Sequence, residues 1–211
     1  MNRRTAFPAT LAVITALTMT ACGNDDTDAP AKGSDKATRV EVPTSSAPAS
    51  DDRPEIELPG DLSYTFDWPK TGDKEKDAVL ADGEQSIKAV DQAIVKQNAL
   101  DKAYLYYYEG EAAAMPQKFV QNYVDHKAAI TGSYRFYAPE VNVDQDGTAS
   151  LSYCEDQGKA FVKYVETDKI KKTEVTAKSY VIYHTSLKKN DKGVWVIQKI
   201  VSESGSAKCR P

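Results

Sequence analysis

Oxygen-bearing side chains are closely spaced along residues 142–147, where they could coordinate a metal ion. This run, Asn-Val-Asp-Gln-Asp-Gly, places oxygen ligands at its first, third and fifth positions and a glycine at its sixth, as calcium-binding loops begin. Such a loop also requires a glutamate at its twelfth position, and Tyr153 stands there instead. The Asp146-Gly147 pair is typical of a β-hairpin. We therefore interpret the run as a polar turn and predict no metal site and no cofactor.

Proton transfer would need a carboxylate or imidazole base in an apolar pocket, together with a hydrogen-bond donor. Asp125 and His126 end a predicted helix, where a histidine is favoured by the helix dipole without any catalytic role. His184 alternates along a predicted strand and suits a half-buried structural position. No matched set of acid, base and nucleophile appears, so we predict no catalytic residue.

Tyrosine is unusually frequent, with 12 tyrosines against five phenylalanines. Its apolar ring and polar tip suit binding surfaces and wet pockets. Several tyrosines are adjacent on one predicted helix, so they spread around its circumference and cannot all face one pocket. We expect ordinary packing for most of them. The helical tyrosines are Tyr104, Tyr106, Tyr107 and Tyr108, and those on predicted strands are Tyr134, Tyr137, Tyr153, Tyr164, Tyr180 and Tyr183.

The three cysteines fall into two groups. Cys22 follows a short apolar stretch near the N-terminus, whereas Cys154 ends a predicted strand and Cys209 lies just beyond the last one. We predict a disulfide between Cys154 and Cys209, which an exported protein can form. It would close a loop of about 56 residues, worth roughly 4 kcal/mol in the chain-entropy description. Two unrelated thiols are the alternative, and a catalytic Cys154 is disfavoured because neither histidine is near it in the sequence.

The residues before Cys22 resemble the lipobox of bacterial lipoproteins. Arg3 and Arg4 form a positive region, an apolar stretch follows, and Met19-Thr20-Ala21 places small residues just before the cysteine. This resemblance implies that residues 1–21 are a signal peptide and that Cys22 carries the lipid anchor. The expected location is the extracytoplasmic side of the cell membrane. An ordinary secretory signal with a chance cysteine is the alternative.

Residues 22–63 read as a disordered tether. Positions 23–63 hold ten acidic and four basic residues, are rich in Pro, Ser, Thr, Ala and Asp, and contain almost no large apolar residue before Ile56. Residues 64–211 hold 21 acidic and 21 basic residues, so the net acidity of the exported chain belongs to the tether. A neutral domain argues against a nucleic-acid partner. The tether either holds the domain off the membrane or contacts a cell-wall polymer.

Residues 64–211 are predicted to form a single domain in which helices come first. Apolar residues recur at three- and four-residue steps over 74–97, which predicts an amphipathic helix capped by Asp73. Further helices are expected over about 100–108 and 116–129, with Pro116 in the first turn of the latter and Gly132 as its stop. Strands are then expected at about 133–143, 148–154, 159–166, 174–188 and 194–203.

This order gives an α+β fold: N-terminal helices packed on a curved antiparallel sheet of about five strands. Over about 70–203 it resembles the cone-shaped fold of the nuclear transport factor 2-like superfamily, which includes ketosteroid isomerase. A second resemblance is to small actinobacterial lipoproteins, through residues 66–69 (Phe-Asp-Trp-Pro), residues 153–157 (Tyr-Cys-Glu-Asp-Gln) and Cys209. That family has no agreed function, so the resemblance implies location and fold.

The sequence therefore predicts a membrane-anchored lipoprotein whose domain is a non-enzymatic ligand-binding or interaction module. One alternative is a cone-fold enzyme, similar to an isomerase or cyclase, acting on a small apolar substrate. Another is a structural accessory subunit. The expected partners are the membrane, through lipid on Cys22, and a small apolar ligand or a cell-envelope protein. Because the last two strands carry large apolar residues on both faces, the side of the sheet away from the helices is expected to be a ligand-lined concavity or a homodimer interface.

Overall fold

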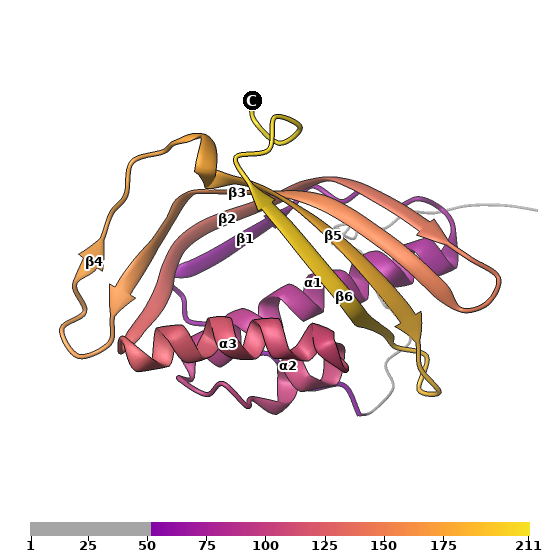
Figure 1. Ribbon diagram of the computed structural model, residues 1–211, viewed down its shortest axis with the longest axis horizontal. Helices are drawn as coiled ribbons and strands as arrows, with labels where there is room; N and C mark the ends of the chain where they lie inside the picture. Colours follow the sequence, from indigo (N-terminus) through magenta and orange to yellow (C-terminus); the bar gives the residue numbers. More distant parts are fainter. Residues whose placement is uncertain (1–51) are drawn as a thin grey trace, which may run out of the picture. The chain divides into compact units, whose positions relative to one another are not determined.

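The computed structural model describes residues 52–211; Cys22, the predicted signal peptide and most of the predicted tether lie outside the described residues. Three helices pack on one side of a curved sheet, and the C-terminal tail lies on its other side (Figure 1). The elements are β1 (Leu62–Phe66), α1 (Lys74–Val95), α2 (Lys102–Tyr107), α3 (Glu111–Asp125), β2 (Ala128–Val143), β3 (Thr148–Tyr164), β4 (Ile170–Lys171), the short 3-10 helix η1 (Ala177–Ser179), β5 (Tyr180–Lys189) and β6 (Trp195–Ser204).

The sheet has the strand order β1-β2-β3-β5-β6, with the short β4 also pairing with β3. All pairs are antiparallel except β1 and β2, which run parallel. The predicted α+β class is confirmed, but the sheet is mixed instead of antiparallel, because β1, a strand that was not predicted, runs parallel to β2. Breaks in register mark bulges between Tyr137 and Glu140 in β2 and at Gln198 in β6, which is the extra residue opposite Ser186 and Leu187 of β5. Bulges bend strands, so they account for the curvature that makes one face concave.

The central strands are longer than predicted. The two strands expected at 148–154 and 159–166 are one strand, β3, and β2 begins at Ala128 instead of 133. Gly132 does not end a helix; it lies inside β2 with a φ of +102°. A Cβ atom there would lie 2.2 Å from the carbonyl oxygen of Lys159 on β3. The glycine is therefore required for the close approach of two strands.

The helices agree with the apolar periodicity. Asp73 caps α1 as predicted, because its side chain accepts hydrogen bonds from the backbone N–H groups of Glu75 and Lys76. The third helix starts at Glu111, so Pro116 lies in its second turn instead of its first. A proline there removes one backbone donor. Burial of Pro116 itself and of Val120 against the core holds the helix in spite of that loss. Among the described helices, none combines the length and apolar character that a membrane span requires.

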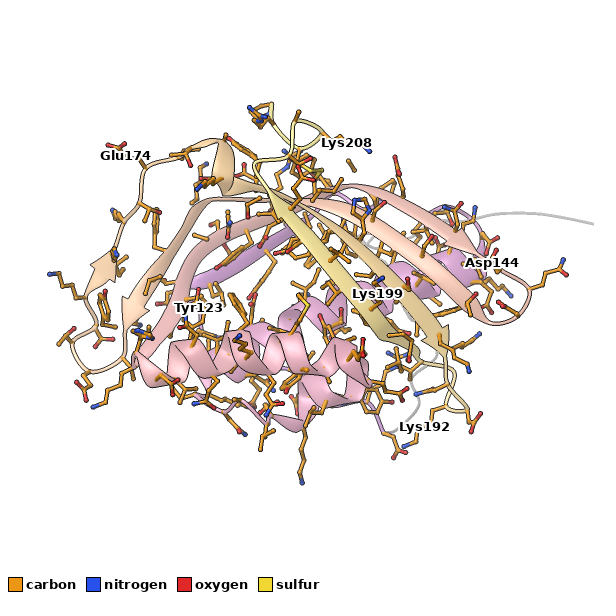
Figure 2. The ribbon with its side chains drawn as sticks, in the orientation of Figure 1. Tyr123, Asp144, Glu174, Lys192, Lys199 and Lys208 are labelled. Carbon is orange, nitrogen blue, oxygen red and sulfur yellow. A yellow bond between two sulfur atoms is a disulfide. The ribbon has the colours of Figure 1, made fainter. Side chains whose placement is uncertain are left out.

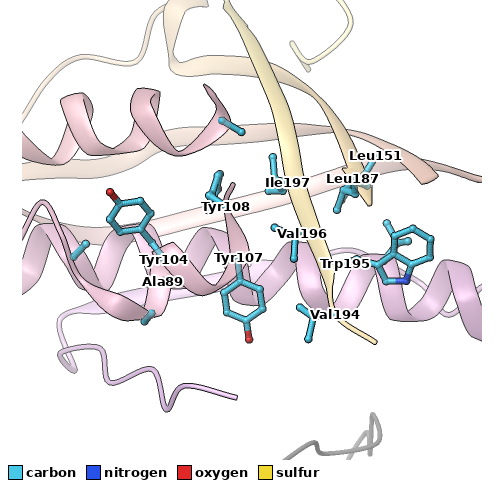
Figure 3. Packing of buried hydrophobic residues seen from close by; sticks show 14 of the residues in the cluster. Ala89, Tyr104, Tyr107, Tyr108, Leu151, Leu187, Val194, Trp195, Val196 and Ile197 are labelled. Atoms are coloured by element: carbon cyan, nitrogen blue, oxygen red, sulfur yellow. The ribbon is translucent and has the colours of Figure 1, made fainter. Parts of the chain in front are cut away.

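The core lies between the helices and the concave face of the sheet. Figure 3 shows Tyr107, Val194 and Trp195 packed within it. A buried carboxylate connects its layers. Asp82 on α1 is 1% exposed, accepts a 2.8 Å hydrogen bond from the backbone N–H of Trp195 on β6, and pairs with Arg53.

The pairing of Arg53 with Asp82 shows that the folded part begins before Tyr64, the predicted start. Residues 53–62 pack on the domain, since the N–H of Glu57 also donates to the Gln92 side chain at 2.6 Å and Leu62 is buried.

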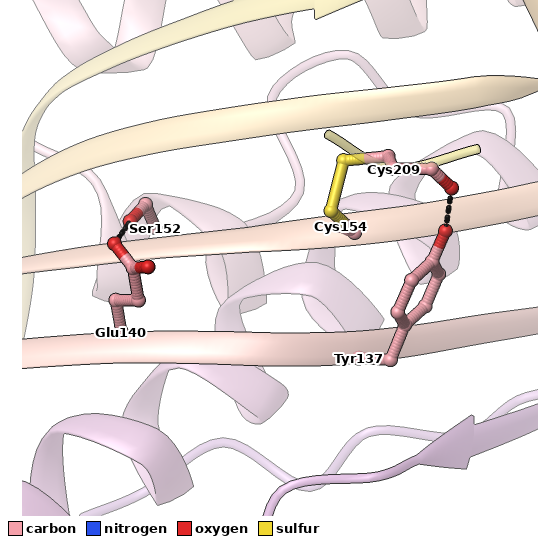
Figure 4. Close-up of a disulfide and its surroundings, with 5 residues drawn as sticks. All are labelled: Tyr137, Glu140, Ser152, Cys154 and Cys209. Atoms are coloured by element: carbon pink, nitrogen blue, oxygen red, sulfur yellow. Dashed lines mark hydrogen bonds between the residues drawn. A yellow bond between two sulfur atoms is a disulfide. The ribbon is translucent and has the colours of Figure 1, made fainter. Parts of the chain in front are cut away.

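The convex face of the sheet carries the predicted disulfide. Cys154 on β3 is bonded to Cys209, with a Cα–Cα distance of 5.5 Å (Figure 4). The hydroxyl of Tyr137 donates to the carbonyl of Cys209, and Ile182 and Tyr180 pack against the bridge. The tail therefore covers Tyr180 and Ile182, two of the apolar residues that led us to expect a ligand-lined concavity on this side, while Val201 of β6 stays 50% exposed. That expectation is wrong, since the concave face is the one turned to the helices; a homodimer through the convex face stays a prediction.

Candidate functional site

A pocket of about 240 Å³ separates the helices from the concave face of the sheet. Its wall is mostly apolar and aromatic, and Figure 2 shows Tyr123 of α3 in the space between that helix and the sheet. Met115 and Phe119 on α3 are 54% and 51% exposed and form part of its rim. The lining residues are Ile87, Val90, Asp91, Ile94, Tyr108, Met115, Pro116, Phe119, Tyr123, Ile130, Tyr134, Phe136, Tyr153, Glu155, Gln157, Tyr183, Ile200 and Ser202.

The spacing of residues along α1 and β3 directs their polar side chains into this pocket. On α1, Ile87, Asp91 and Ile94 are spaced by four and three residues, so they share one helix face. On β3, Tyr153, Glu155 and Gln157 occupy alternate positions and therefore point to the concave side. The intervening Cys154 points to the convex side, where it forms the disulfide. One stretch of β3 thus carries the cross-link on one face and the pocket on the other.

Asp91 is the polar group that the helices contribute. The hydroxyl of Tyr64, on β1, donates a 2.7 Å hydrogen bond to its Oδ2 atom. Burial raises the pKa of Asp91 to about 7, although the hydrogen bond from Tyr64 acts in the opposite direction. The carboxyl therefore binds a proton more readily than an exposed aspartate does.

Glu155 is the corresponding group on the sheet. It is 7% exposed, and the hydroxyl of Tyr183, on β5, donates to its Oε2 atom at 2.9 Å. Burial, followed by the negative charges of Asp91 and Asp156, raises the pKa of Glu155 to about 7, while the Tyr183 hydrogen bond lowers it. The two pocket carboxyls thus influence one another's ionisation, as neighbouring acids do.

The pocket offers these carboxylates no positive partner. No lysine, arginine or histidine of the described chain lines it. Each carboxylate has one oxygen bonded to a tyrosine, and no hydrogen bond to its other oxygen occurs among residues 52–211. Burial raises the pKa of Tyr134 and of Tyr153, so both hydroxyls stay protonated and can donate.

Aromatic rings form much of the remaining surface. Tyr153 and Tyr183 stack with their centroids 5.0 Å apart, and Phe119 meets Tyr123 edge to face at 5.2 Å. Such pairs hold the rings in fixed orientations. The pocket can therefore accept a small ligand with an apolar or aromatic body, and it can exchange hydrogen bonds or protons with that ligand through two carboxyls.

The acid–base candidates named from the sequence lie elsewhere. Asp125 and His126 are exposed at the end of α3, where Asp125 accepts a hydrogen bond from Gln121. His184 is exposed on the convex side of β5. Within the helical tyrosine cluster, only Tyr108 lines the pocket; Tyr104 and Tyr107 are buried in the core, as ordinary packing predicts.

Residues 144–147 form the hairpin turn between β2 and β3, in agreement with the sequence interpretation. The N–H of Asp144 donates to the carbonyl of Thr148 at 2.9 Å, and the Asp146 side chain accepts from the backbone of Thr148. Residues 52–211 contain no cluster of three or more His, Cys, Asp or Glu residues placed to hold a metal.

The sequence interpretation missed Asp91 and Glu155, although each leaves a signal. Asp91 interrupts the apolar stripe of α1 between Ile87 and Ile94. Glu155 lies two residues after Tyr153, at the same phase of a strand that was predicted to end at position 154. A charged residue at a predicted core position often marks a functional site.

No protein-family profile and no curated protein sequence matches this chain. Among solved structures, a ketosteroid isomerase-like protein from Erwinia carotovora atroseptica is 13% identical, with 63% of this chain and 97% of that chain covered and a TM-score of 0.41. ActVI-ORFA from Streptomyces coelicolor is 8% identical, with 61% and 95% covered and a TM-score of 0.40. At these values the likeness carries no functional conclusion, so function is argued from the pocket.

Proposed function

We propose that the domain is a small-molecule-binding module, held at the outer surface of the cell membrane by a lipid on Cys22. The pocket carries this proposal. It is concave and mostly apolar, and it contains two convergent polar groups, Asp91 and Glu155. These are the features of small-ligand sites in proteins. A volume of about 240 Å³ suits a ligand with one ring or a short chain.

Blocking the pocket tests the binding function. Ile200 lies on β6 and lines the pocket, so Ile200→Trp would fill it with an indole ring. His184→Trp is the matched control, because it adds the same ring to an exposed convex position of the neighbouring strand. We expect small aromatic compounds, detected by ligand-observed NMR, to bind the wild type and His184→Trp, and to bind Ile200→Trp at least tenfold more weakly. Unchanged binding to Ile200→Trp would place the ligand elsewhere.

The membrane part of the proposal rests on the residues before Cys22. The apolar stretch and the Met19-Thr20-Ala21 sequence supply a lipoprotein-type signal. Cys22→Ala should abolish incorporation of a labelled fatty acid and release the protein or leave it unprocessed. The Cys154→Ser, Cys209→Ser double variant is the control and should keep the label. Label retained in Cys22→Ala would contradict lipid attachment at this residue.

Proton-transfer catalysis is the second candidate, favoured by the ionisation of the two carboxyls. Groups with a pKa of about 7 can both take and give protons at neutral pH, which is the condition for general acid–base catalysis. An enzyme of this type would exchange the α-hydrogen of a bound carbonyl compound with solvent. NMR of small cyclic ketones in D₂O would detect that exchange. Exchange that Glu155→Gln or Asp91→Asn abolishes in a folded protein would replace the binding function by catalysis.

A further inference from the structure

Two negative groups without a positive partner occupy an otherwise apolar pocket. Glu155 is more than nine-tenths buried, and Asp91 lies on the opposite wall of the same pocket. A carboxylate in such surroundings is costly unless a cation or hydrogen bonds compensate it. One tyrosine hydroxyl for each carboxylate supplies part of that compensation. What is missing is a positive charge.

The aromatic lining favours the same kind of ligand. Tyr134, Tyr153 and Tyr183 lie around the carboxylates, and the faces of such rings attract cations. Aromatic walls together with acidic groups are the arrangement by which proteins bind ammonium groups. An anion, by contrast, would meet two carboxylates and no basic residue of the described chain.

We propose that the pocket binds an organic cation, a small amine with an aromatic or apolar body whose ammonium group pairs with Asp91 and Glu155. This inference rests on the proposed binding function and names its ligand class. A metal ion fits less well, because the described residues offer no third acidic, histidine or cysteine ligand near the two carboxylates. The apolar walls would also strip a hydrated ion of its water without replacing it. An amine brings its own apolar body to those walls.

Three probe compounds with the same phenyl ring but different charges distinguish the effect of ligand charge from that of ligand shape. 2-Phenylethylamine is a cation, 2-phenylethanol is neutral and phenylacetate is an anion, and all three carry one phenyl ring. Binding to the purified full-length protein is measured by calorimetry at pH 8, where both carboxyls are largely ionised and an aliphatic amine is still protonated. We expect the amine to bind at least tenfold more tightly than the alcohol, and phenylacetate to bind weakest.

Isosteric variants then assign the preference to the two carboxylates. Asp91→Asn and Glu155→Gln should each reduce the affinity for the amine at least fivefold while changing the affinity for the alcohol less than twofold. Asp125→Asn, at an exposed position outside the pocket, is the control and should bind all three probes as the wild type does. Circular dichroism verifies that each variant is folded.

The probe series on the wild type alone decides the matter if a variant does not fold. Equal or tighter binding of the alcohol or of phenylacetate would overturn the inference and leave the binding function standing. If none of the three probes bound at millimolar concentration, both the inference and the proposed function would be contradicted.

Discussion

The hydroxyl of Tyr183 donates a hydrogen bond to Glu155 across the neighbouring strands β5 and β3. The two residues lie diagonally on the concave face, since Tyr183 is paired with Tyr153 and Glu155 with Val181. The bond supports the charged form of Glu155 inside an apolar cavity, and it opposes the effect of burial. A contact between two residues 28 positions apart in sequence therefore helps to set the ionisation of the pocket.

Removing this donor should raise the pKa of Glu155 above its value of about 7. We expect Tyr183→Phe to do so and to lower the free energy of unfolding by about 2 kcal/mol at pH 8, where a charged acceptor loses its partner. At pH 5 the loss should be smaller, because the carboxyl is protonated. Carbon-13 NMR of the glutamate carboxyl gives the pKa. Tyr180→Phe, on the convex face of the same strand, is the control, and an equal shift there would refute the assignment.

The two raised pKa values predict a characteristic dependence of stability on pH. Asp91 and Glu155 have ordinary pKa values of 3.8 and 4.5 and folded values of about 7. Between these limits the folded state binds more protons than the unfolded state. The contribution of the two carboxyls to the free energy of unfolding is therefore fully present below about pH 4 and is lost as the pH rises to about 7. The slope reaches about 1.4 kcal/mol per pH unit for each carboxyl.

Neutral isosteres should remove this dependence. The Asp91→Asn, Glu155→Gln double variant is expected to be more stable than the wild type at pH 8 and to lose that advantage at pH 5. Urea unfolding at both values measures the difference. A stability difference that does not change with pH would show that the carboxyls titrate normally.

The disulfide should stabilise the domain without affecting the pocket. Cys154 and Cys209 are 55 residues apart, and closure of that loop in the unfolded chain is worth at most about 4 kcal/mol. We expect the Cys154→Ser, Cys209→Ser double variant to melt earlier yet to bind small ligands with unchanged affinity, because the bridge lies on the convex face. Melting curves and the probe titration together test this. Loss of binding in a folded variant would show that the tail supports the pocket.

Arg53 should contribute more to the stability of the fold than Arg135, whose ion pair is exposed. Arg53→Ala leaves Asp82 buried with a single backbone donor, so we expect a loss of about 3 kcal/mol. Adding Asp82→Asn should recover part of it by removing the charge. Arg135→Ala breaks an exposed pair with Asp67 and should cost under about 1 kcal/mol. Equal losses for the two arginine variants would argue against an Arg53–Asp82 contact in solution.

The helices and the order of the strands followed from local periodicity, whereas β1 and the continuity of β3 did not. Leu62–Phe66 is five residues long and directly follows a polar, proline-rich segment, so its alternation is too brief to identify a strand. In β3, Gly158 lies where the apolar alternation lapses, which made one strand read as two. Pairing with β2 shifts register here, since Lys159 pairs with Ser133 and Asp156 with Arg135, but it resumes on both sides and keeps β3 a single strand. Pairing between strands distant in the sequence cannot be predicted from the local pattern of apolar residues.

The candidate site shows the same division. Asp125, His126 and His184 attracted attention by residue type. The helix end that carries the first two was predicted from the sequence, whereas the exposure of His184 on a convex face depends on tertiary structure. Asp91 was assigned to the polar face of its helix, and Glu155 lay just beyond a predicted strand end. In the structure both side chains line the wall of the cavity under the curved sheet. Bulges in β2 and β6 produce that curvature, and neither was predicted from the sequence.

The contact between Arg53 and Asp82 also decides how the domain bears mechanical load. Tension along the chain that precedes residue 52 reaches Arg53 before it reaches Leu62, the first residue of β1. As an edge strand, β1 is hydrogen-bonded to β2 alone, and a strand pulled from an edge can separate one hydrogen bond at a time. Arg53 passes the force to Asp82 on α1, and Asp82 is bonded to the backbone of β6 in the core. We therefore expect a pull from the N-terminal side to load the core through Asp82 before it separates β1 from β2.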